Sequence, residues 1–484
     1  MKYFFVCLAC FISCNLLAHV SDSLYKEKYR PQYHFTPKHR WIGDPCGLIK
    51  HSGKYLAYSW GAAVSDDLVY WNELNDHAIK QVPEGISTFT GSVVIDKNNT
   101  AGWGNNVPIA VFTSFDEASK KQSQSIAFSH DGGMTYMFYD RNPVLDIWST
   151  EFRDPTVIWD EGSKRWIMLV AKALEKKVAF YSSTDMKHWT WLSDFGPLGD
   201  SEKSWECPDM FQLPLDNLPA GKKWVLVVSV NWMREQYFIG EFDGVKFIPD
   251  NTGDYPLYID KGLDYYASRV FRDYDDSSAP VYTIGWLNTW DYAETAPTTW
   301  GKGIWSVPRE YRLRNTPEGL RLIQKPFDGL SKLRGARHTF KRKIKAGLTE
   351  IPFVKEMNNV YELDVTFSNM GNKPVGIFLC EGENKKAVLS YDPQSQYITL
   401  DRTNVSQTAI PKFERMSSCK VPAVNGRIRF HCYVDKSSVE IFVNDGEATL
   451  SFLTFPSDNQ TGCSVFSLGM ANVDLTAWKL KSIW

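Results

Sequence analysis

The chain has 484 residues, of which 43% are hydrophobic and 14% aromatic, and its 54 basic and 56 acidic side chains leave a formal net charge of -2. A chain of this length and apolar content is expected to fold as about two globular domains. Because the charges nearly cancel and no basic block stands out, the sequence gives no electrostatic reason to expect a nucleic-acid partner. The 18 Trp and 23 Tyr residues suit sugar ligands, whose C–H faces stack on aromatic rings, although most such rings in β proteins pack across strands.

The N-terminus has the pattern of a signal peptide, which we predict over residues 1–18. A positively charged start is followed by an apolar run from Tyr3 to Ile12, which is too short to span a bilayer. We therefore expect an exported protein without a membrane span. Two forms of processing stay open: lipid attachment at Cys14, which ends a lipobox-like sequence, or cleavage after Ala18. The protein would then be secreted, periplasmic or lipid-anchored at the cell surface.

The cysteines indicate neither a metal site nor a dense disulfide framework. Three of the nine lie in the leader, and nothing in the rest of the chain resembles a CxxC or His-rich metal site, so no metal or other cofactor is expected. An exported chain could pair the four cysteines of its last third, which are Cys380, Cys419, Cys432 and Cys463. We expect Cys46 and Cys207 to be free buried thiols.

Residues 29–323 consist of short β-type runs separated by turns, with almost no helical periodicity. One turn pattern recurs at Ser65–Trp71 and Ser183–Trp189, with related turns at Ser129–Tyr136 and Glu241–Phe247. A spacing of roughly 55 to 65 residues suits one four-stranded unit per repeat, so we predict a five-bladed β-propeller. Turns of this kind are also common between strands of unrelated β proteins, which would make the repeat a coincidence.

A basic segment at residues 324–343 is predicted to be an irregular connector, followed by a second domain over residues 344–484. Apolar and alternating runs such as Val360–Phe367 and Arg427–Val434 indicate a separate C-terminal β-sandwich, and Asn444–Glu447 is a strong hairpin signal. The predicted fold class is therefore all-β. The sandwich either binds carbohydrate or supports the propeller, and the lack of a recognisable aromatic platform favours support.

Three acidic residues lie directly before a proline or one residue away from it. Asp44 is found in Trp41–Gly47 (WIGDPCG), Asp154 in FRDP, and Glu206 in WECP. A residue before proline is restricted to extended backbone, which fixes the direction of its side chain. Any one such acid is more often a turn residue, but three of them at blade-like spacing would converge on the axis of a propeller. Hydrolysis by carboxylates is the chemistry that this pattern favours.

Six motifs in order resemble glycoside hydrolase family 32, the β-fructosidases that include invertases, levanases and inulinases. The motifs are WIGDPCG, Phe89–Ser92 (FTGS), FRDP, WECP, Gly285–Trp290 (GWLNTW) and Trp305–Glu310 (WSVPRE). The resemblance runs from about Tyr29 to the C-terminus. It implies a five-bladed propeller with a funnel-shaped site on its axis, a C-terminal sandwich, and release of terminal β-D-fructofuranosyl units with retention of configuration.

The resemblance assigns roles to particular residues. Asp44 matches the family nucleophile, Glu206 the general acid/base, and Asp154 the acid that holds fructose hydroxyls and stabilises the transition state. A retaining enzyme needs its two working carboxyl groups about 5 to 5.5 Å apart, one ionised and one protonated. Arg153 would favour ionised acids, and apolar neighbours such as Trp205 would raise the pKa of Glu206. The positions matching the fructose pocket are Trp41, Phe89, Thr90, Arg153, Asp260, Trp286 and Trp290.

This sequence departs from the family pattern around its first motif. The family's usual WMNDPNG is WIGDPCG here, so Gly43 and Cys46 replace two asparagines and one expected contact to fructose is missing. The next family element, a Tyr-Gln and a loop before Trp-Gly-His, is shortened to Tyr58–Ala62. A differently shaped entrance would admit a branched fructan or an unusual fructoside and weakens the case for selection of sucrose.

Other functions stay open on the sequence alone. A fructosyltransferase would use the same three carboxylates and pass fructose to a sugar instead of water. A non-catalytic fructan-binding protein would keep the aromatic pocket and dispense with the acids, which are all retained here. A different five-bladed glycosidase, such as an arabinan-active enzyme, would not combine FRDP with WECP. The sequence leaves the oligomeric state open.

Overall fold

The computed structural model describes residues 24–216, 218–250 and 253–484, and its structure is almost entirely β. The predicted signal peptide and Cys14 lie outside these residues. Within them, no helix is long and apolar enough to cross a membrane. The helical segments are short: the 3-10 helices η1 (Ala173–Glu175), η2 (Ala293–Thr295) and η3 (Asp328–Leu333), and α2 (Pro352–Lys355). The all-β class is therefore confirmed.

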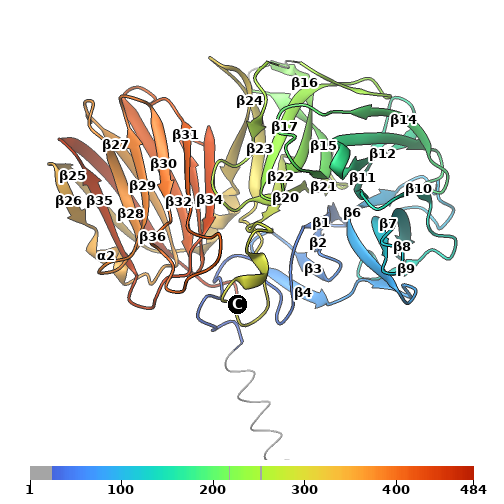
Figure 1. Ribbon diagram of the computed structural model, residues 1–484, viewed down its shortest axis with the longest axis horizontal. Helices are drawn as coiled ribbons and strands as arrows, with labels where there is room; N and C mark the ends of the chain where they lie inside the picture. The colour runs from blue at the N-terminus through green and yellow to red at the C-terminus, as the bar shows by residue number, and fades with distance from the viewer. Residues whose placement is uncertain (1–23, 217, 251–252) are drawn as a thin grey trace, which may run out of the picture.

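The N-terminal two thirds form a propeller of antiparallel sheets (Figure 1). The first sheet contains β1 (Cys46–His51), β2 (Lys54–Tyr58), β3 (Ala62–Ser65) and β4 (Trp71–Asn75), with β21 (Arg272–Asp273) parallel to β1. The second contains β6 (Ile86–Asp96), β7 (Val107–Asp116), β8 (Gln122–Phe128) and β9 (Tyr136–Phe138), with β5 (Ile79–Lys80) beside β9 and β10 (Leu145–Ser149) beside β8. The third contains β11 (Phe152–Asp160), β12 (Arg165–Lys172), β13 (Lys177–Ser183) and β14 (Thr190–Phe195).

The fourth sheet has nine strands and joins two antiparallel runs. One run contains β15 (Trp205–Leu215), β16 (Leu218–Val230), β17 (Arg234–Phe242), β18 (Phe247–Pro249) and β19 (Leu257–Tyr258). The other contains β20 (Tyr266–Val270), β22 (Val281–Trp286), β23 (Arg309–Thr316) and β24 (Gly319–Pro326). A single parallel pairing, Leu215 with Leu313, connects the two runs. The count of five blades stays a prediction, because hydrogen bonds define four sheets here.

The recurring turns found in the sequence occupy equivalent places in the fold. Each connects the third and fourth strands of its run: Ser65–Trp71 between β3 and β4, Ser129–Tyr136 between β8 and β9, Ser183–Trp189 between β13 and β14, and Glu241–Phe247 between β17 and β18. In each turn an Asp side chain accepts hydrogen bonds from backbone N–H groups that follow it by two to four residues. Asp67, for example, accepts from Val69 and Tyr70. This local hydrogen bonding explains why the turn sequence repeats.

The propeller core lies between neighbouring sheets. One apolar cluster joins Ile49 and Leu56 of the first sheet to Val93 and Phe112 of the second, and further clusters join the second sheet to the third and the third to the fourth. Face-to-face packing of this kind buries both faces of each sheet. The first strand of each run is thereby held at the centre of the propeller.

Residues after the propeller form a two-sheet sandwich (Figure 1). One sheet contains β25 (Arg334–Ile344), β36 (Ala471–Leu480), β27 (Tyr361–Ser368), β32 (Arg427–Asp435), β33 (Ser438–Val443) and β34 (Ala448–Leu453). The other contains β26 (Gly347–Glu350), β35 (Gly462–Ser467), β28 (Val375–Glu381), β29 (Ala387–Asp392), β30 (Tyr397–Asp401) and β31 (Met416–Lys420). The four cysteines of this domain are buried and unpaired, so the disulfides that the sequence allowed are not formed.

The segment predicted as an irregular connector, residues 324–343, is ordered. It contains the end of β24, the short helix η3 and most of β25, which pairs with β36 over the length of the sandwich edge. The prediction of irregular structure was wrong because it rested on the basic side chains of this segment. β25 is an edge strand whose side chains mostly face solvent, where charged residues are tolerated.

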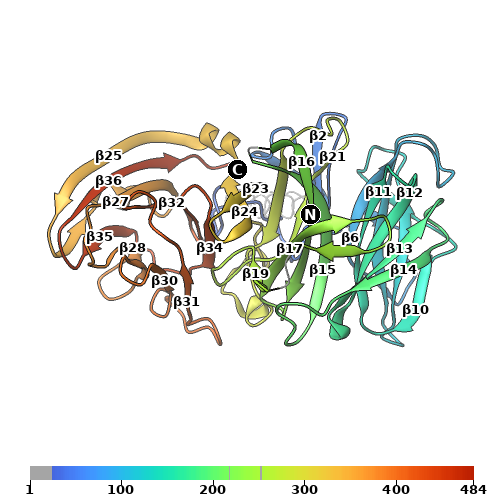
Figure 2. The ribbon, with the colours of Figure 1, turned by 90° about the horizontal axis from the view of Figure 1, so that it is seen from above.

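Propeller and sandwich pack through β24 against β33 and β34 (Figure 2). The interface is charged and buried: Arg309 of β23 pairs with Asp260 and with Glu440 of β33. His34, before the first blade, contacts Asp435 and Glu440. These pairs fix the second domain against the propeller, away from the inner ends of the first strands.

Candidate active site

A cavity of about 730 Å³ opens where the first strands of the propeller runs begin. Its lining comes from the loop before β1, from β6, β11 and β15, and from the loops around them. The lining residues are Trp41, Gly43, Asp44, Cys46, Ser59, Trp60, Thr88, Phe89, Thr90, Gln122, Glu151, Arg153, Asp154, Glu206, Trp232 and Trp290. All three predicted catalytic acids therefore meet in one cavity.

Each first strand begins with a register shift at the cavity. The shifts lie at Cys46/Ile49, Thr88/Gly91, Arg153/Thr156, Glu206/Asp209 and Tyr266/Arg269. Left-handed backbone accompanies them at Gly47, Asp154, Cys207 and Ala267. A non-glycine residue in this conformation costs about 1 to 3 kcal/mol and is typical of functional sites. The bulges turn side chains from the sheet faces towards the axis.

Asp44 accepts two hydrogen bonds on one of its oxygens. The Thr90 hydroxyl donates to Oδ2 at 2.7 Å, and the Cys207 thiol approaches the same atom at 3.4 Å. Oδ1 is buried and accepts no hydrogen bond from the described residues. Oδ1 therefore has free lone pairs, but in this structure it is buried and not exposed in the cavity.

Asp154 is joined to Asp44 through Cys207. The backbone N–H of Cys207 donates to Asp154 Oδ2 at 3.0 Å, and its thiol lies 3.6 Å from the same oxygen. The Thr113 hydroxyl accepts a hydrogen bond from the backbone N–H of Asp154 at 2.9 Å. The expectation that Cys46 and Cys207 are free buried thiols is confirmed. Cys207 also separates the two carboxylates and holds their relative positions.

Glu206 is bound by a cation and a phenol. Arg153 donates to Oε1 from Nε at 2.9 Å, its Nη2 lies 2.8 Å from the same oxygen, and the Tyr266 hydroxyl donates to Oε2. Arg153 also donates to Glu151 and Gln122, which fixes the guanidinium. Both groups donate to the carboxylate, so they favour the ionised form of Glu206 and oppose the effect of burial on its pKa.

Burial raises the pKa of Asp44, Asp154 and Glu206 above the ordinary values of these carboxyls. The hydrogen bond from Thr90 opposes this for Asp44, while the charge of Arg153 opposes it for Asp154 and Glu206. Neighbouring carboxylates also repel one another, so they ionise in separate steps. We expected Trp205 to raise the pKa of Glu206, but its ring packs against Phe195 and Phe238 in the core.

Aromatic rings form one wall of the cavity. The Trp41 and Trp290 rings stack with centroids 5.8 Å apart, and Phe89 stacks on Phe115 at 4.8 Å. Trp286 is fully buried behind Trp41 and Trp290 and does not line the cavity. It therefore supports the aromatic wall and does not itself face a ligand.

The atypical first motif has its own local packing. Gly43 bonds Ser59 Oγ through its N–H at 3.3 Å, and its carbonyl accepts from Trp305 at 2.9 Å. A side chain at Gly43 would meet Trp41 Nε1 at 3.1 Å. The Cys46 thiol donates to the carbonyl of Asp44 at 3.3 Å. Ser59 and Trp60, from the shortened loop, line the cavity where the family's glutamine was expected.

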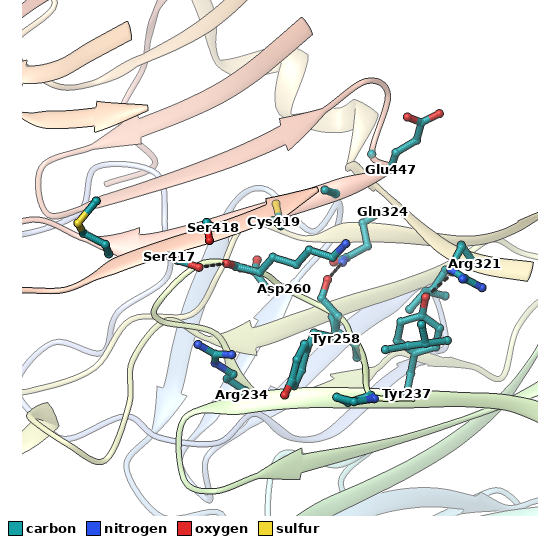
Figure 3. Close-up of a pocket in the computed structure, with 18 residues that line it drawn as sticks. Arg234, Tyr237, Tyr258, Asp260, Arg321, Gln324, Ser417, Ser418, Cys419 and Glu447 are labelled. Carbon is teal, nitrogen blue, oxygen red and sulfur yellow. Dashed lines mark hydrogen bonds between the residues drawn. The ribbon is translucent and has the colours of Figure 1, made fainter. Parts of the chain in front are cut away.

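Asp260 is not in the active-site cavity. It lies in a separate cavity of about 480 Å³ between propeller and sandwich, close to Gln324 and Ser417 (Figure 3). Its carboxylate pairs with Arg309 at 3.0 Å and accepts the backbone N–H of Ser451 at 2.8 Å. The carboxylate therefore holds the two domains together, and the pocket role expected of it is wrong.

Several residues of the site were missed from the sequence. Tyr266 of β20 bonds Glu206 but follows no acid-proline motif, so no local signal marked it. The cavity-lining residues that were missed are Thr88, Gln122, Glu151 and Trp232. Of these, Glu151 stands in the same motif region as Asp154, two residues before Arg153, and its spacing from that arginine could have been used.

Known proteins with similar sequences agree with the family resemblance found in the motifs. The description "Glycosyl hydrolases family 32 N-terminal domain" matches residues 34–326, and "Glycosyl hydrolases family 32 C terminal" matches residues 329–479. The levanase of Bacillus subtilis (strain 168) is 34% identical over 96% of this chain and 72% of its own length. The extracellular exo-inulinase of Aspergillus awamori is 31% identical over 95% of this chain and 96% of its own length.

Solved structures agree in fold. The crystal structure of the exo-inulinase from Aspergillus awamori aligns with a TM-score of 0.87 at 30% identity, covering 95% of this chain and all of that one. A fructofuranosidase from Schwanniomyces occidentalis complexed with fructose aligns at 0.82 and 26% identity, covering 95% of this chain and 99% of that one.

Proposed function

Because the chain belongs to glycoside hydrolase family 32 and is a β-fructofuranosidase or exo-fructanase that releases fructosyl units from sucrose or fructans, we propose that Asp44, Glu206 and Asp154 carry out this reaction with retention of configuration. The observation that supports this best is the meeting of the three carboxylates in one cavity, joined through Cys207 and Arg153.

In the first step, Asp44 attacks the anomeric carbon of the terminal fructose. Glu206, whose pKa burial raises, protonates the departing glycosidic oxygen. The bond to the leaving sugar breaks as the bond to Asp44 forms, which gives a fructosyl-enzyme ester. Thr90 and Cys207 donate to Oδ2, which fixes the orientation of the Asp44 carboxylate.

In the second step, water attacks the same carbon and releases fructose from Asp44. Glu206, now ionised beside Arg153, takes the proton from that water. Asp154 binds fructose hydroxyls and stabilises positive charge on the ring as it develops. Trp41, Trp290, Phe89 and Thr90 are the side chains proposed to surround the sugar.

The test is hydrolysis of sucrose, inulin and levan by wild type, Asp44→Asn and Glu206→Gln. Removal of a general acid/base is expected to lower kcat by on the order of 10² to 10⁴-fold, with unfolding midpoints unchanged. Full activity in both variants would refute the assignment. Free fructose as the product fits hydrolysis, whereas kestose-like products would instead indicate transfer.

Export is also proposed. The signal-like leader and the likeness to proteins named extracellular exo-inulinase support it. Mass spectrometry of the mature N-terminus distinguishes cleavage after Ala18 from lipid attachment at Cys14.

A further inference from the structure

Trp148 is the most exposed large apolar side chain of the described residues. It lies in β10 with 83% of its surface accessible. Its backbone is left-handed, with φ at 60°. Folded chains gain free energy by burying such a ring and by avoiding this backbone conformation. An exposed indole also offers a flat apolar face on which the C–H groups of a sugar can stack.

The ring of Trp148 is held in place. Its backbone N–H donates to Asp146 Oδ1 at 2.7 Å, and the Lys121 ammonium pairs with Asp146 Oδ2 at 2.8 Å. The same ammonium lies 4.1 Å from the centroid of the Trp148 ring. One face of the indole is thus covered by a cation. With the ring so exposed, the other face is open to solvent, and its orientation is set before a ligand arrives.

Trp148 does not line the active-site cavity, but its neighbours in the chain and in the sheet do. Ser149, the next residue, pairs with Gln122 of β8, which lines the cavity and bonds Arg153. Glu151, three residues beyond Trp148, also lines the cavity.

The neighbouring strand connects this position to the aromatic wall. Phe115 of β7 lies opposite Gln122 and stacks on Phe89, a cavity residue. Pairing of β7, β8 and β10 therefore places Phe115, Gln122 and Ser149 on adjacent strands beside the cavity.

We propose that Trp148 and Lys121 form an accessory site for the fructan chain, which binds fructose units that extend beyond the cavity. The proposal rests on the fructan hydrolysis described above. Sugar C–H groups would stack on the open face of the indole, while Lys121 and Asp146 offer a donor and an acceptor to the hydroxyls. Sucrose has a single sugar beyond its fructose and is too short to occupy both places. The site therefore favours polymers over sucrose.

The kinetic test compares Trp148→Ala with Trp191→Ala on sucrose, levan and inulin. Trp191 is a matched control, because it is 56% exposed on β14 and bonds Asp194, away from the cavity residues. We expect Trp148→Ala to lower kcat/KM on levan or inulin about three- to tenfold, mainly through KM, with less than a twofold change on sucrose. Trp148→Phe should recover part of the loss. An equal loss on sucrose, or none on either polymer, overturns the proposal.

A binding test separates this inference from the catalytic assignment. In the Asp44→Asn background, migration in gels that contain levan or inulin reports polymer binding without turnover. Adding Trp148→Ala should weaken the retardation by the polymer, whereas adding Trp191→Ala should not. If the retardation is unchanged by Trp148→Ala, the accessory site is refuted. If instead the wild type releases no fructose from any substrate, the proposed function fails, and the gels still decide the role of Trp148.

Discussion

The imidazole of His34 makes the stability of this protein depend on pH. Its two ring nitrogens lie 2.8 Å from Asp435 and 2.9 Å from Glu440, at the junction of propeller and sandwich. Burial lowers the pKa of His34, but the hydrogen bonds and charges of the two carboxylates outweigh it and raise the pKa from 6.5 to about 9. The folded protein therefore holds a proton that the unfolded chain releases near neutral pH.

The size of the effect follows from that difference. A rise from 6.5 to about 9 at 1.36 kcal/mol per pH unit corresponds to about 3 kcal/mol of stability. Below pH 6.5 both states are protonated and the contribution is complete. As the pH rises towards 9 the unfolded state loses its proton first, so the free energy of unfolding falls. Above about 9 the contribution is gone.

Urea unfolding, followed by tryptophan fluorescence at several pH values between 6.5 and about 9, measures this directly. Wild type should lose about 3 kcal/mol across the range. His34→Gln should be less stable at the acidic end and nearly independent of pH over the same range. If the free energy of unfolding fell equally with pH in wild type and variant, the reasoning would be refuted, because groups other than His34 would then cause the loss.

Two further substitutions test the roles given to buried polar groups. Tyr266→Phe removes a hydrogen bond that lowers the pKa of Glu206. The alkaline limb of the pH profile of kcat/KM on sucrose should therefore move to higher pH. If the limb does not move, a group other than Glu206 is responsible for it. Asp260→Asn leaves the charge of Arg309 without one partner, and urea unfolding should show a loss of about 3 to 5 kcal/mol with KM for sucrose within twofold of wild type. A raised KM at unchanged stability would return Asp260 to the sugar pocket.

The same backbone feature, a bulge at the start of the first strand, recurs in every run of the propeller. A bulge at the start of each first strand carries a residue whose side chain or backbone N–H faces the axis, as Asp154 and Cys207 do. Asp154 of β11 and Glu206 of β15 are thus held by separate sheets, and Asp44 stands two residues before β1.

Local chemistry made much of this predictable. Asp44 and Asp154 stand before prolines and Glu206 one residue further away, which made the three acids recognisable in the sequence. The extended backbone expected before proline is wrong for Asp154, whose φ is 64° because it lies in the bulge at the start of β11. The Asp-containing turns recur because each satisfies its own N–H groups, and the turn after Val443 has positive φ at Asn444, Asp445 and Gly446, residues that tolerate it. These are short-range constraints, so the sequence alone determined the strands, the repeated turns and the three acids.

Tertiary structure decided the rest. Asp260 and Tyr266 lie six residues apart, yet one joins the sandwich through Ser451 and the other holds Glu206 in the cavity. Nothing local distinguishes them, because the partners come from segments far along the chain. Likewise, no motif marks Trp148 as a neighbour of the active site; strand pairing between β8 and β10 places it there. The sequence identified the three carboxylates that are proposed to act. Closure of the sheets around one axis, together with docking of the sandwich, decided which other side chains surround them.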